Sequence, residues 1–214
     1  MVRDHAVLCR GWGLRFEILV CDDGSADATW PILTALGAEV PELILLRNAA
    51  RLGITRSMVR LFGAAQGAWW YFVPADGQLG SEALARLWPA REGAAVVVGR
   101  RTPRRDSRSR VLMARLYSAV LRLIYRLPVR DIDSVKLYDA AVLRRIGFES
   151  RTDFFQAELL IAYRRAGLAM RELPVPHHAR QAGRALGVTP LSAFRSIRDL
   201  AWFVAHDLAR QSRR

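Results

Sequence analysis

Two adjacent carboxylates, Asp22 and Asp23, follow a short apolar run over residues 18–21. Such a run is typical of a strand that is buried on both faces of a parallel sheet. A glycine and a serine come next, as expected where the chain turns into a helix. Ligands of open α/β sheets bind at this end of the strands, so the two carboxylates could accept hydrogen bonds from a nucleobase and a ribose. The alternative is an ordinary turn with capping side chains.

The elements that would position these residues alternate along the first half of the chain. Apolar runs predict strands at residues 43–46, 69–73 and 95–99, and the segments between them predict helices at about 27–36, 56–66 and 81–88. This alternation favours an α/β fold with a mainly parallel sheet and helices on both faces. Asp76 and Gln78 follow the strand at 69–73 and should lie at the same sheet edge as Asp22, where they could also fill ordinary turn positions.

Arginine dominates the charge of this chain. Its 214 residues include 33 basic and 20 acidic side chains, with a net charge of +13, and Lys136 is the only lysine. Such an excess indicates an anionic partner: phosphate groups, an anionic membrane surface or nucleic acid. No nucleic-acid-binding motif is present in the sequence, so we expect no nucleic-acid partner. No stretch has the length of a transmembrane helix or the pattern of a signal peptide, which predicts a cytoplasmic location.

Two basic stretches in the second half mix arginine with large apolar residues. A basic loop at 102–110 leads into the first, at about 111–127, and the second covers about 191–211. Amphipathic helices of this composition can lie in a membrane interface, which predicts peripheral attachment at the inner face of the cell membrane. Alternatively, each helix packs its apolar face on the sheet and leaves its arginines in solvent.

The segment from Asp22 to Thr29 resembles the "DDGSxDGT" signature of the family 2 glycosyltransferases, which have the GT-A fold. Residues 48–67, 74–78, 99–101, 131–138 and 174–183 resemble further family segments in the family's order. The chain is most similar to the polyprenyl-phosphate branch, which includes dolichol-phosphate mannose synthases. The resemblance implies a three-layer αβα fold. It also implies inverting transfer of a sugar from a UDP- or GDP-linked donor to a polyprenyl phosphate or another membrane-proximal acceptor.

On the donor side, the resemblance implies that Asp22, Asp23 and Arg51 bind the nucleotide. Arg180, in a loop similar to "PVxHyxRxxG", would reach the diphosphate.

The metal motif of the family, "DADxQ", corresponds to residues 74–78. The resemblance implies that Asp76 and Gln78 hold Mg²⁺ or Mn²⁺, a hard cation that neutralises the leaving diphosphate. Pro74 replaces the first aspartate of the motif, which removes one ligand.

On the acceptor side, Arg101 and Arg110 would bind the acceptor phosphate, since guanidinium groups suit phosphate oxygens. A serine that the family places one turn after Arg110 corresponds to Ala114 here. Asp131 and Asp133 lie in a segment similar to "DxxSGFK" and are the candidate catalytic residues. Since a phosphate acceptor is already ionised near neutral pH, they would orient it more than deprotonate it. Capping of a helix is their alternative role.

We expect one domain over residues 1–214. Residues 1–101 would form the nucleotide- and metal-binding half, 102–190 the acceptor half, and 191–214 a basic C-terminal helix. Family members open with a strand and a "PxYNE"-like segment that the sequence lacks, so we expect an N-terminally truncated fold without the first βα unit. Residues 1–14 should then provide too little apolar surface to replace that unit. A degenerate, non-catalytic relative that binds membranes or a partner is the alternative function.

Overall fold

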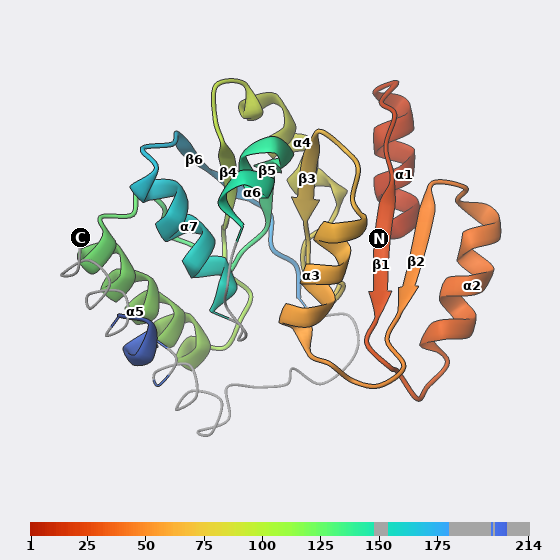
Figure 1. Cartoon of the computed structure of the whole chain (residues 1–214), viewed down its shortest axis with the longest axis horizontal. Coiled ribbons are helices and arrows are strands. Elements are labelled where there is room, and N and C mark those ends of the chain that lie inside the picture. Colours follow the sequence, from red (N-terminus) through yellow and green to blue (C-terminus); the bar gives the residue numbers. More distant parts are fainter. Residues whose placement is uncertain (148–153, 180–197, 199, 205–214) are drawn as a thin grey trace.

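The computed structural model describes residues 1–147, 154–179, 198 and 200–204 (Figure 1). Helices and strands alternate as the sequence predicts. The helices are α1 (Val2–Gly11), α2 (Thr29–Glu39), α3 (Ile54–Ala64), α4 (Ser81–Leu87), the 3₁₀ helix η1 (Trp88–Arg91), α5 (Arg108–Tyr125), α6 (Ala140–Ile146) and α7 (Phe155–Arg165). The strands are β1 (Ile18–Asp22), β2 (Leu43–Arg47), β3 (Trp69–Phe72), β4 (Val96–Arg101), β5 (Lys136–Asp139) and β6 (Met170–Val175).

These six strands form two hydrogen-bonded groups. β1 and β2 pair in parallel, with Ile18 opposite Leu43. The other four follow the order β3-β5-β4-β6, in which β5 is antiparallel to both of its neighbours and β4 is parallel to β6. The arrowheads of β1, β2 and β3 point to the same lower edge in Figure 1. Because β5 runs the opposite way, the segment that precedes it lies at that edge as well.

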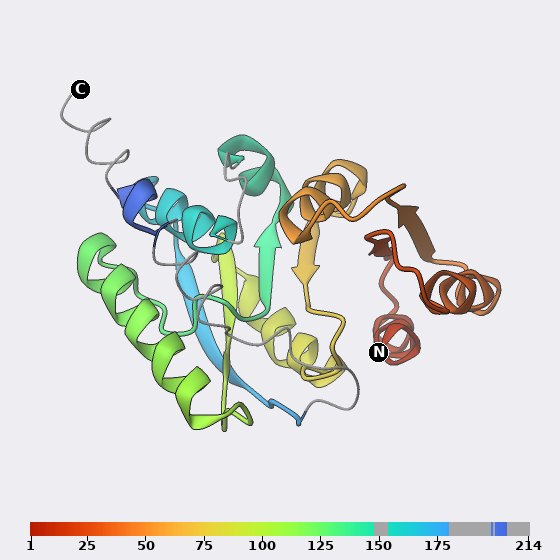
Figure 2. The same cartoon turned by 90° about the horizontal axis from the view of Figure 1, so that it is seen from below.

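Helices cover both faces of the strands, which confirms the expected α/β architecture. Viewed from below, α3, α6 and α7 lie on one side and α1 and α4 on the other (Figure 2). β4 shows why: Val96 and Val98 pack into one apolar core, while Val97 packs into the opposite core, and all three are fully buried. Alternation of side chains along a strand thus supplies both layers at once.

β1 departs from the expectation of burial on both faces. Residues 18–21 are only partly buried, and Asp22 is the one buried residue of the strand. The reason lies in the pairing, since among the described strands β1 bonds only to β2, and β3 only to β5. The apolar run predicted a central strand, but no second strand among the described residues pairs with β1.

The N-terminal segment forms a helix that the sequence interpretation did not predict. This helix, α1, buries His5, Ala6 and Cys9. Cys9 packs in the same core as residues of α4. The sequence interpretation missed this helix because the segment carries few large apolar residues, whereas small ones suffice at its contact with α4.

The C-terminal helix expected at 191–211 lies mostly outside the described residues. Within that range the structure describes residues 198 and 200–204, which are helical. α5 begins at Arg108, so the basic loop is shorter than the expected 102–110.

Gly99 offers a test of this packing. A Cβ built there would lie 2.6 Å from Val135 Cγ2 and 3.0 Å from Val175 Cγ2, whereas one at Gly63 would meet nothing within 4 Å. We expect Gly99→Ala to lower the free energy of unfolding by about 1–3 kcal/mol through overpacking. Gly63→Ala, in the interior of α3, should be neutral or stabilising by up to about 1 kcal/mol. Urea unfolding of both variants checks this, and equal midpoints would contradict the packing described.

Candidate active site

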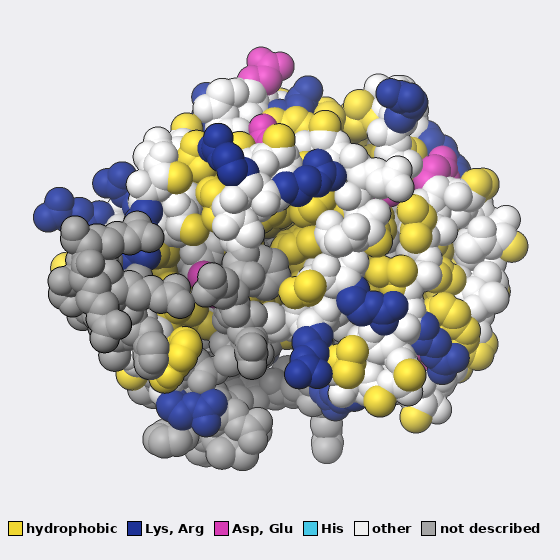
Figure 3. Space-filling view, viewed as in Figure 1, with side chains coloured by type: hydrophobic (Ala, Val, Ile, Leu, Met, Phe, Trp, Pro, Cys, Tyr) yellow, Lys and Arg dark blue, Asp and Glu magenta, His cyan; other side chains and the backbone are white. Residues whose placement is uncertain are grey.

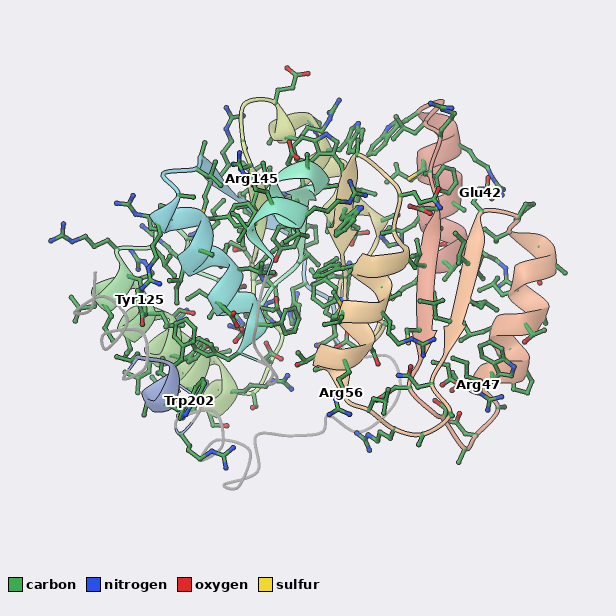
Figure 4. All side chains as sticks on the ribbon, viewed as in Figure 1. Glu42, Arg47, Arg56, Tyr125, Arg145 and Trp202 are labelled. Carbon is green, nitrogen blue, oxygen red and sulfur yellow. The ribbon has the colours of Figure 1, made fainter. Side chains whose placement is uncertain are left out.

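The candidate site residues gather at the lower edge of the sheet, where the parallel strands end. Arg47 closes β2, and Arg56 lies near the start of α3; both side chains are seen at this edge in Figure 4. The strand register extends the edge to the second half of the chain. Phe72 of β3 lies opposite Lys136 of β5, so the segment before Lys136 and the segment after Phe72 are neighbours.

Asp22, the last residue of β1, is buried. Its Oδ1 accepts a hydrogen bond of 3.1 Å from the Ser25 amide, and its Oδ2 lies 3.2 Å from Arg47 Nε. Although that distance is short, Oδ2 has no partner with hydrogen-bond geometry. The guanidinium of Arg47 also lies 4.9 Å from the centre of the Trp30 ring. Asp22 therefore ties the end of β1 to the end of β2 and the start of α2.

Asp23 holds the loop between β2 and α3. Its carboxylate accepts hydrogen bonds from the Leu52 and Gly53 amides, both at 2.9 Å, and from the side chains of Asn48 and Ser57. Partial burial raises the pKa of Asp23, but these bonds outweigh it and leave the pKa below its ordinary value. The sequence interpretation assigned Asp23 to nucleotide binding, and the structure shows that its oxygens are engaged within the protein.

The same loop carries Arg51, which is exposed. It passes so close to Gly24 that a Cβ there would lie 2.9 Å from the Arg51 nitrogen and 2.8 Å from the Ala50 carbonyl carbon. Gly24 also has a φ of 73°, a conformation that favours glycine. The glycine of the signature thus permits the loop to approach the end of β1, and the approach sets the position of Arg51.

Asp76 and Gln78 have different environments. Asp76 is partly exposed and its Oδ1 accepts a hydrogen bond from the Gln78 amide. Gln78 is buried, and its side-chain nitrogen lies 3.5 Å from the carbonyl oxygen of His178. In the described part of the chain, no three His, Cys, Asp or Glu side chains form a metal-binding group. A single carboxylate still fits Mg²⁺ or Mn²⁺ when a diphosphate supplies further oxygens.

Arg101 and Asp131 form a buried ion pair. Arg101 donates from Nε and Nη2 to the two carboxylate oxygens, at 2.9 and 2.6 Å, and its backbone amide donates to the same group at 3.0 Å. Arg104 lies 3.8 Å from Asp131. Burial raises the pKa of Asp131, but Arg101 outweighs this effect and leaves the pKa below its ordinary value. Asp131 is therefore an ionised anchor with no free oxygen for a proton.

Asp133 differs from Asp131 in its exposure to solvent and in the direction of its pKa shift. It is exposed to solvent, yet the surrounding protein raises the pKa of its carboxyl above the ordinary value, an effect that Lys136 and Arg101 oppose. Lys136 is fully buried and donates to the Ser134 carbonyl and the Gln156 side chain. Burial lowers the pKa of Lys136 to about 7, although Asp133 and Asp131 act against the shift. Of the two candidate catalytic residues, Asp133 is the one whose carboxyl is accessible and is not held by an arginine.

Arg110 makes a looser contact than Arg101. Its Nε lies 3.7 Å from Asp106, whose other oxygen binds Arg104 at 2.9 Å. The loop between β4 and α5 is further held by His177, whose Nδ1 accepts the Arg105 amide at 3.0 Å. Arg180 lies outside the described residues.

The sequence interpretation missed Glu172, Arg104 and Lys136 as parts of this site. Glu172 of β6 accepts the backbone amides of Arg130 and Asp131 and so orients the segment that carries Asp133. An acidic residue in the middle of a strand was the available signal. Lys136 offered another, as the single lysine of an arginine-rich chain.

Replacement of Arg101 tests whether the ion pair is structural. We expect Arg101→Gln to lower the free energy of unfolding by about 3–5 kcal/mol, because it leaves a buried carboxylate unpaired. Arg110→Gln, at a half-exposed contact, should cost at most about 1 kcal/mol. Denaturant titration of both variants near neutral pH measures the difference.

The pH dependence of stability provides a second test of this ion pair. Because Arg101 holds the pKa of Asp131 below its unfolded value of about 3.9, the stabilisation is present above that value and is lost as the pH falls through the lower folded pKa. In Arg101→Gln this acid limb should flatten. A variant with unchanged stability and acid limb would rule out the structural role.

Comparisons with known proteins place this geometry in a family. The family model "Glycosyl transferase family 2" matches residues 5–152. A dolichol-phosphate mannosyltransferase of Pyrococcus furiosus is 31% identical over 90 residues, which are 42% of this chain and 25% of the relative. The glycosyltransferase AglD of Haloferax volcanii is 29% identical over 169 residues, which are 75% of this chain and 27% of AglD. The chain thus spans about a quarter of the length of these relatives.

Among solved structures, glucosyl-3-phosphoglycerate synthase of Mycobacterium tuberculosis in complex with Mn²⁺ and UDP-glucose is similar, with a TM-score of 0.64. The likeness covers 92% of this chain and 72% of the synthase at 20% identity, and it shows the GT-A fold. With a family model matched over more than half of its length and this fold, the chain belongs to glycosyltransferase family 2.

Proposed function

We propose that this glycosyltransferase moves a sugar, with inversion, from a UDP- or GDP-linked donor to a polyprenyl phosphate. The observation that carries the proposal is that the segments of Asp76 and Asp133 lie at the same sheet edge. Asp76 follows β3 and Asp133 precedes β5, and these strands pair with Phe72 opposite Lys136. Both carboxylates are accessible, unlike Asp131. A metal-binding carboxylate and a proton-exchanging carboxylate in neighbouring segments suit transfer from a diphosphate donor.

The donor would lie across the ends of β1, β2 and β3. The loop that Asp23 holds presents Arg51 to its phosphates, Asp22 fixes the wall beneath the nucleoside, and Arg180 would add a further positive charge. Asp76, with Gln78 behind it, would hold Mg²⁺ or Mn²⁺ against the diphosphate. When bound, the metal neutralises the charge that develops on the leaving diphosphate. The crystallised synthase with Mn²⁺ and UDP-glucose supports this arrangement by its fold alone.

The acceptor would approach from the side of Asp133. An ionised phosphate needs orientation more than deprotonation, and Asp133, with its raised pKa, can hold a proton when a hydroxyl acceptor takes that place. Asp131 and Arg101 act by positioning this segment. The name of the Pyrococcus relative, a dolichol-phosphate mannosyltransferase, supports a lipid phosphate as acceptor.

A non-catalytic relative is the second candidate. It is favoured by the edges of β1 and β3, which pair with no further strand among the described residues, and by the engagement of Gln78 with His178. Backbone groups left unpaired at a strand edge are unfavourable for a sheet. Such a protein would bind membranes without binding a nucleotide.

Nucleotide binding separates the two candidates. We expect UDP or GDP to bind more tightly with Mn²⁺ or Mg²⁺ than without, and Asp76→Ala to abolish the metal-dependent gain. Asp27→Ala, which removes an exposed carboxylate near the same edge, should keep that gain. Isothermal titration calorimetry measures all arms. Metal-dependent binding that survives in Asp76→Ala would remove the metal role of Asp76, and no nucleotide binding by the parent chain would favour the non-catalytic relative.

Membrane attachment is the other part of the proposal. The outer side of α5 exposes Leu112, Leu116 and Leu123, and Trp202 is also exposed. Basic side chains outnumber acidic ones on the face seen in Figure 3. Within the described residues, no helix is long and apolar enough to cross a membrane. These features fit a helix that lies in the interface of an anionic membrane.

Flotation with liposomes tests this attachment. We expect binding to anionic vesicles that weakens at high salt, and little binding to neutral ones. Leu123→Ser should reduce it, whereas Ile32→Ser, at another exposed position on α2, should not. Attachment indifferent to lipid charge, to salt and to Leu123→Ser would contradict the proposal.

A further inference from the structure

A pocket of about 690 Å³ opens between the end of β4, the loop after it and one face of α5. Its lining is rich in arginine: Arg100, Arg101, Arg104, Arg115, Arg122 and Arg130. Among the described residues that line it, Asp131 is the only acidic one. Guanidinium groups that gather with so little negative charge repel one another, and a bound anion would relieve this repulsion.

The charges of these arginines are not equally neutralised. Arg101 and Arg104 face Asp131 at 2.6 and 3.8 Å. Arg100 has a buried Nε without a hydrogen bond, and its nearest carboxylate, Glu172, is 3.8 Å away. Within the described residues, the guanidinium groups of Arg115, Arg122 and Arg130 have neither a hydrogen bond nor an ion pair. The pocket therefore contains donors for a ligand that the protein itself does not satisfy.

The sequence of α5 builds this face. Arg115 and Arg122 are seven residues apart, about two helical turns, so both point to the same side. Ala114, Ser118 and Ala119 lie on that side as well. Their small side chains leave the space between the arginines open.

An apolar stripe runs beside the pocket. Leu112, Leu116 and Leu123 are 66, 58 and 83% exposed. Leu116 and Leu123 each follow one of the pocket arginines by one residue, which is about 100° around the helix. A ligand with a phosphate head and an apolar chain could place its head in the pocket and its chain along this stripe.

We propose that the pocket binds the acceptor phosphate through Arg100, Arg115, Arg122 and Arg130, with the acceptor's apolar chain along Leu112, Leu116 and Leu123. This inference rests on the proposed function, because it assigns the acceptor site of the same reaction. It differs from the sequence interpretation, which gave this role to Arg101 and Arg110. Guanidinium forks bind phosphate oxygens in pairs, and unpaired arginines do so without first losing a carboxylate partner.

Direct binding of phosphate probes to the full chain tests the site apart from catalysis. The probes are farnesyl phosphate, which has an apolar chain, and 3-phosphoglycerate, which has none. The pocket variant is Arg115→Gln with Arg122→Gln. The control is Arg108→Gln, which removes a charge from the same helix outside the pocket. Circular dichroism establishes that each variant is folded, and calorimetry with UDP and Mn²⁺ reports the donor site independently.

We expect farnesyl phosphate to bind the parent chain and Arg108→Gln alike, and the pocket variant at least about tenfold more weakly, since each lost charge-assisted bond weakens binding by about this factor. Leu116→Ser with Leu123→Ser should weaken farnesyl phosphate but not 3-phosphoglycerate. Unchanged affinity in the folded pocket variant would overturn the site.

Equal affinity for both probes, insensitive to the leucine variant, would overturn the lipid-linked source and indicate a free phosphate ester. Loss of UDP binding with intact farnesyl phosphate binding would defeat the proposed function while keeping the pocket.

Discussion

The buried ion pair between Arg101 and Asp131 organises this molecule more than any other single contact. It joins the last residue of β4 to the segment that precedes β5, and three hydrogen bonds fix its geometry. Because a buried carboxylate is costly without a partner, the two segments cannot separate without a large loss of stability. The position of Asp133 and the start of the loop before α5 both follow from this constraint.

The same pair shows that the arginines of this chain have two different roles, which depend on whether a carboxylate lies near. Where a guanidinium meets Asp131 or Asp106, it is part of the framework, as for Arg101 and Arg104. Where no carboxylate of the described residues pairs with the guanidinium, as for Arg115 and Arg122, the charge faces a pocket. Arginines that look alike in sequence thus have different roles, because the tertiary fold decides which of them meets a carboxylate.

The loop after β2, on the side proposed for the donor, is held by the carboxylate of Asp23. Asp23 gathers the amides of Leu52 and Gly53 with two side chains, and so gives the loop after β2 one conformation. This loop lies on the β1–β2 pair, which has no strand bonds to β3 among the described residues. The link between the two strand groups is made instead by helix contacts, such as those of α3 with β1 and of α1 with α4. The proposed donor site is therefore built on the less rigidly joined half of the sheet.

The sequence by itself determined the order of the elements from β1 to α5, the family, and the edge at which the candidate site residues lie. Apolar runs and turn residues are local signals, and the strands at β2, β3 and β4 follow from them closely. The residues at Asp22 and Asp76 likewise predicted a common edge, since parallel strands bring their carboxyl ends together.

Only the tertiary structure decided which charged group is free to act. Asp22 and Asp23 look alike in sequence. Asp22 is buried at the end of a strand, whereas the carboxylate of Asp23 accepts hydrogen bonds from four donors. Asp131 and Asp133 are two residues apart, yet one is locked by Arg101 and the other meets solvent. The shortage of strand neighbours for β1 and the presence of α1 were equally invisible in the pattern. Pairing, burial and charge compensation depend on residues distant in the chain, and a local sequence pattern contains no information about them.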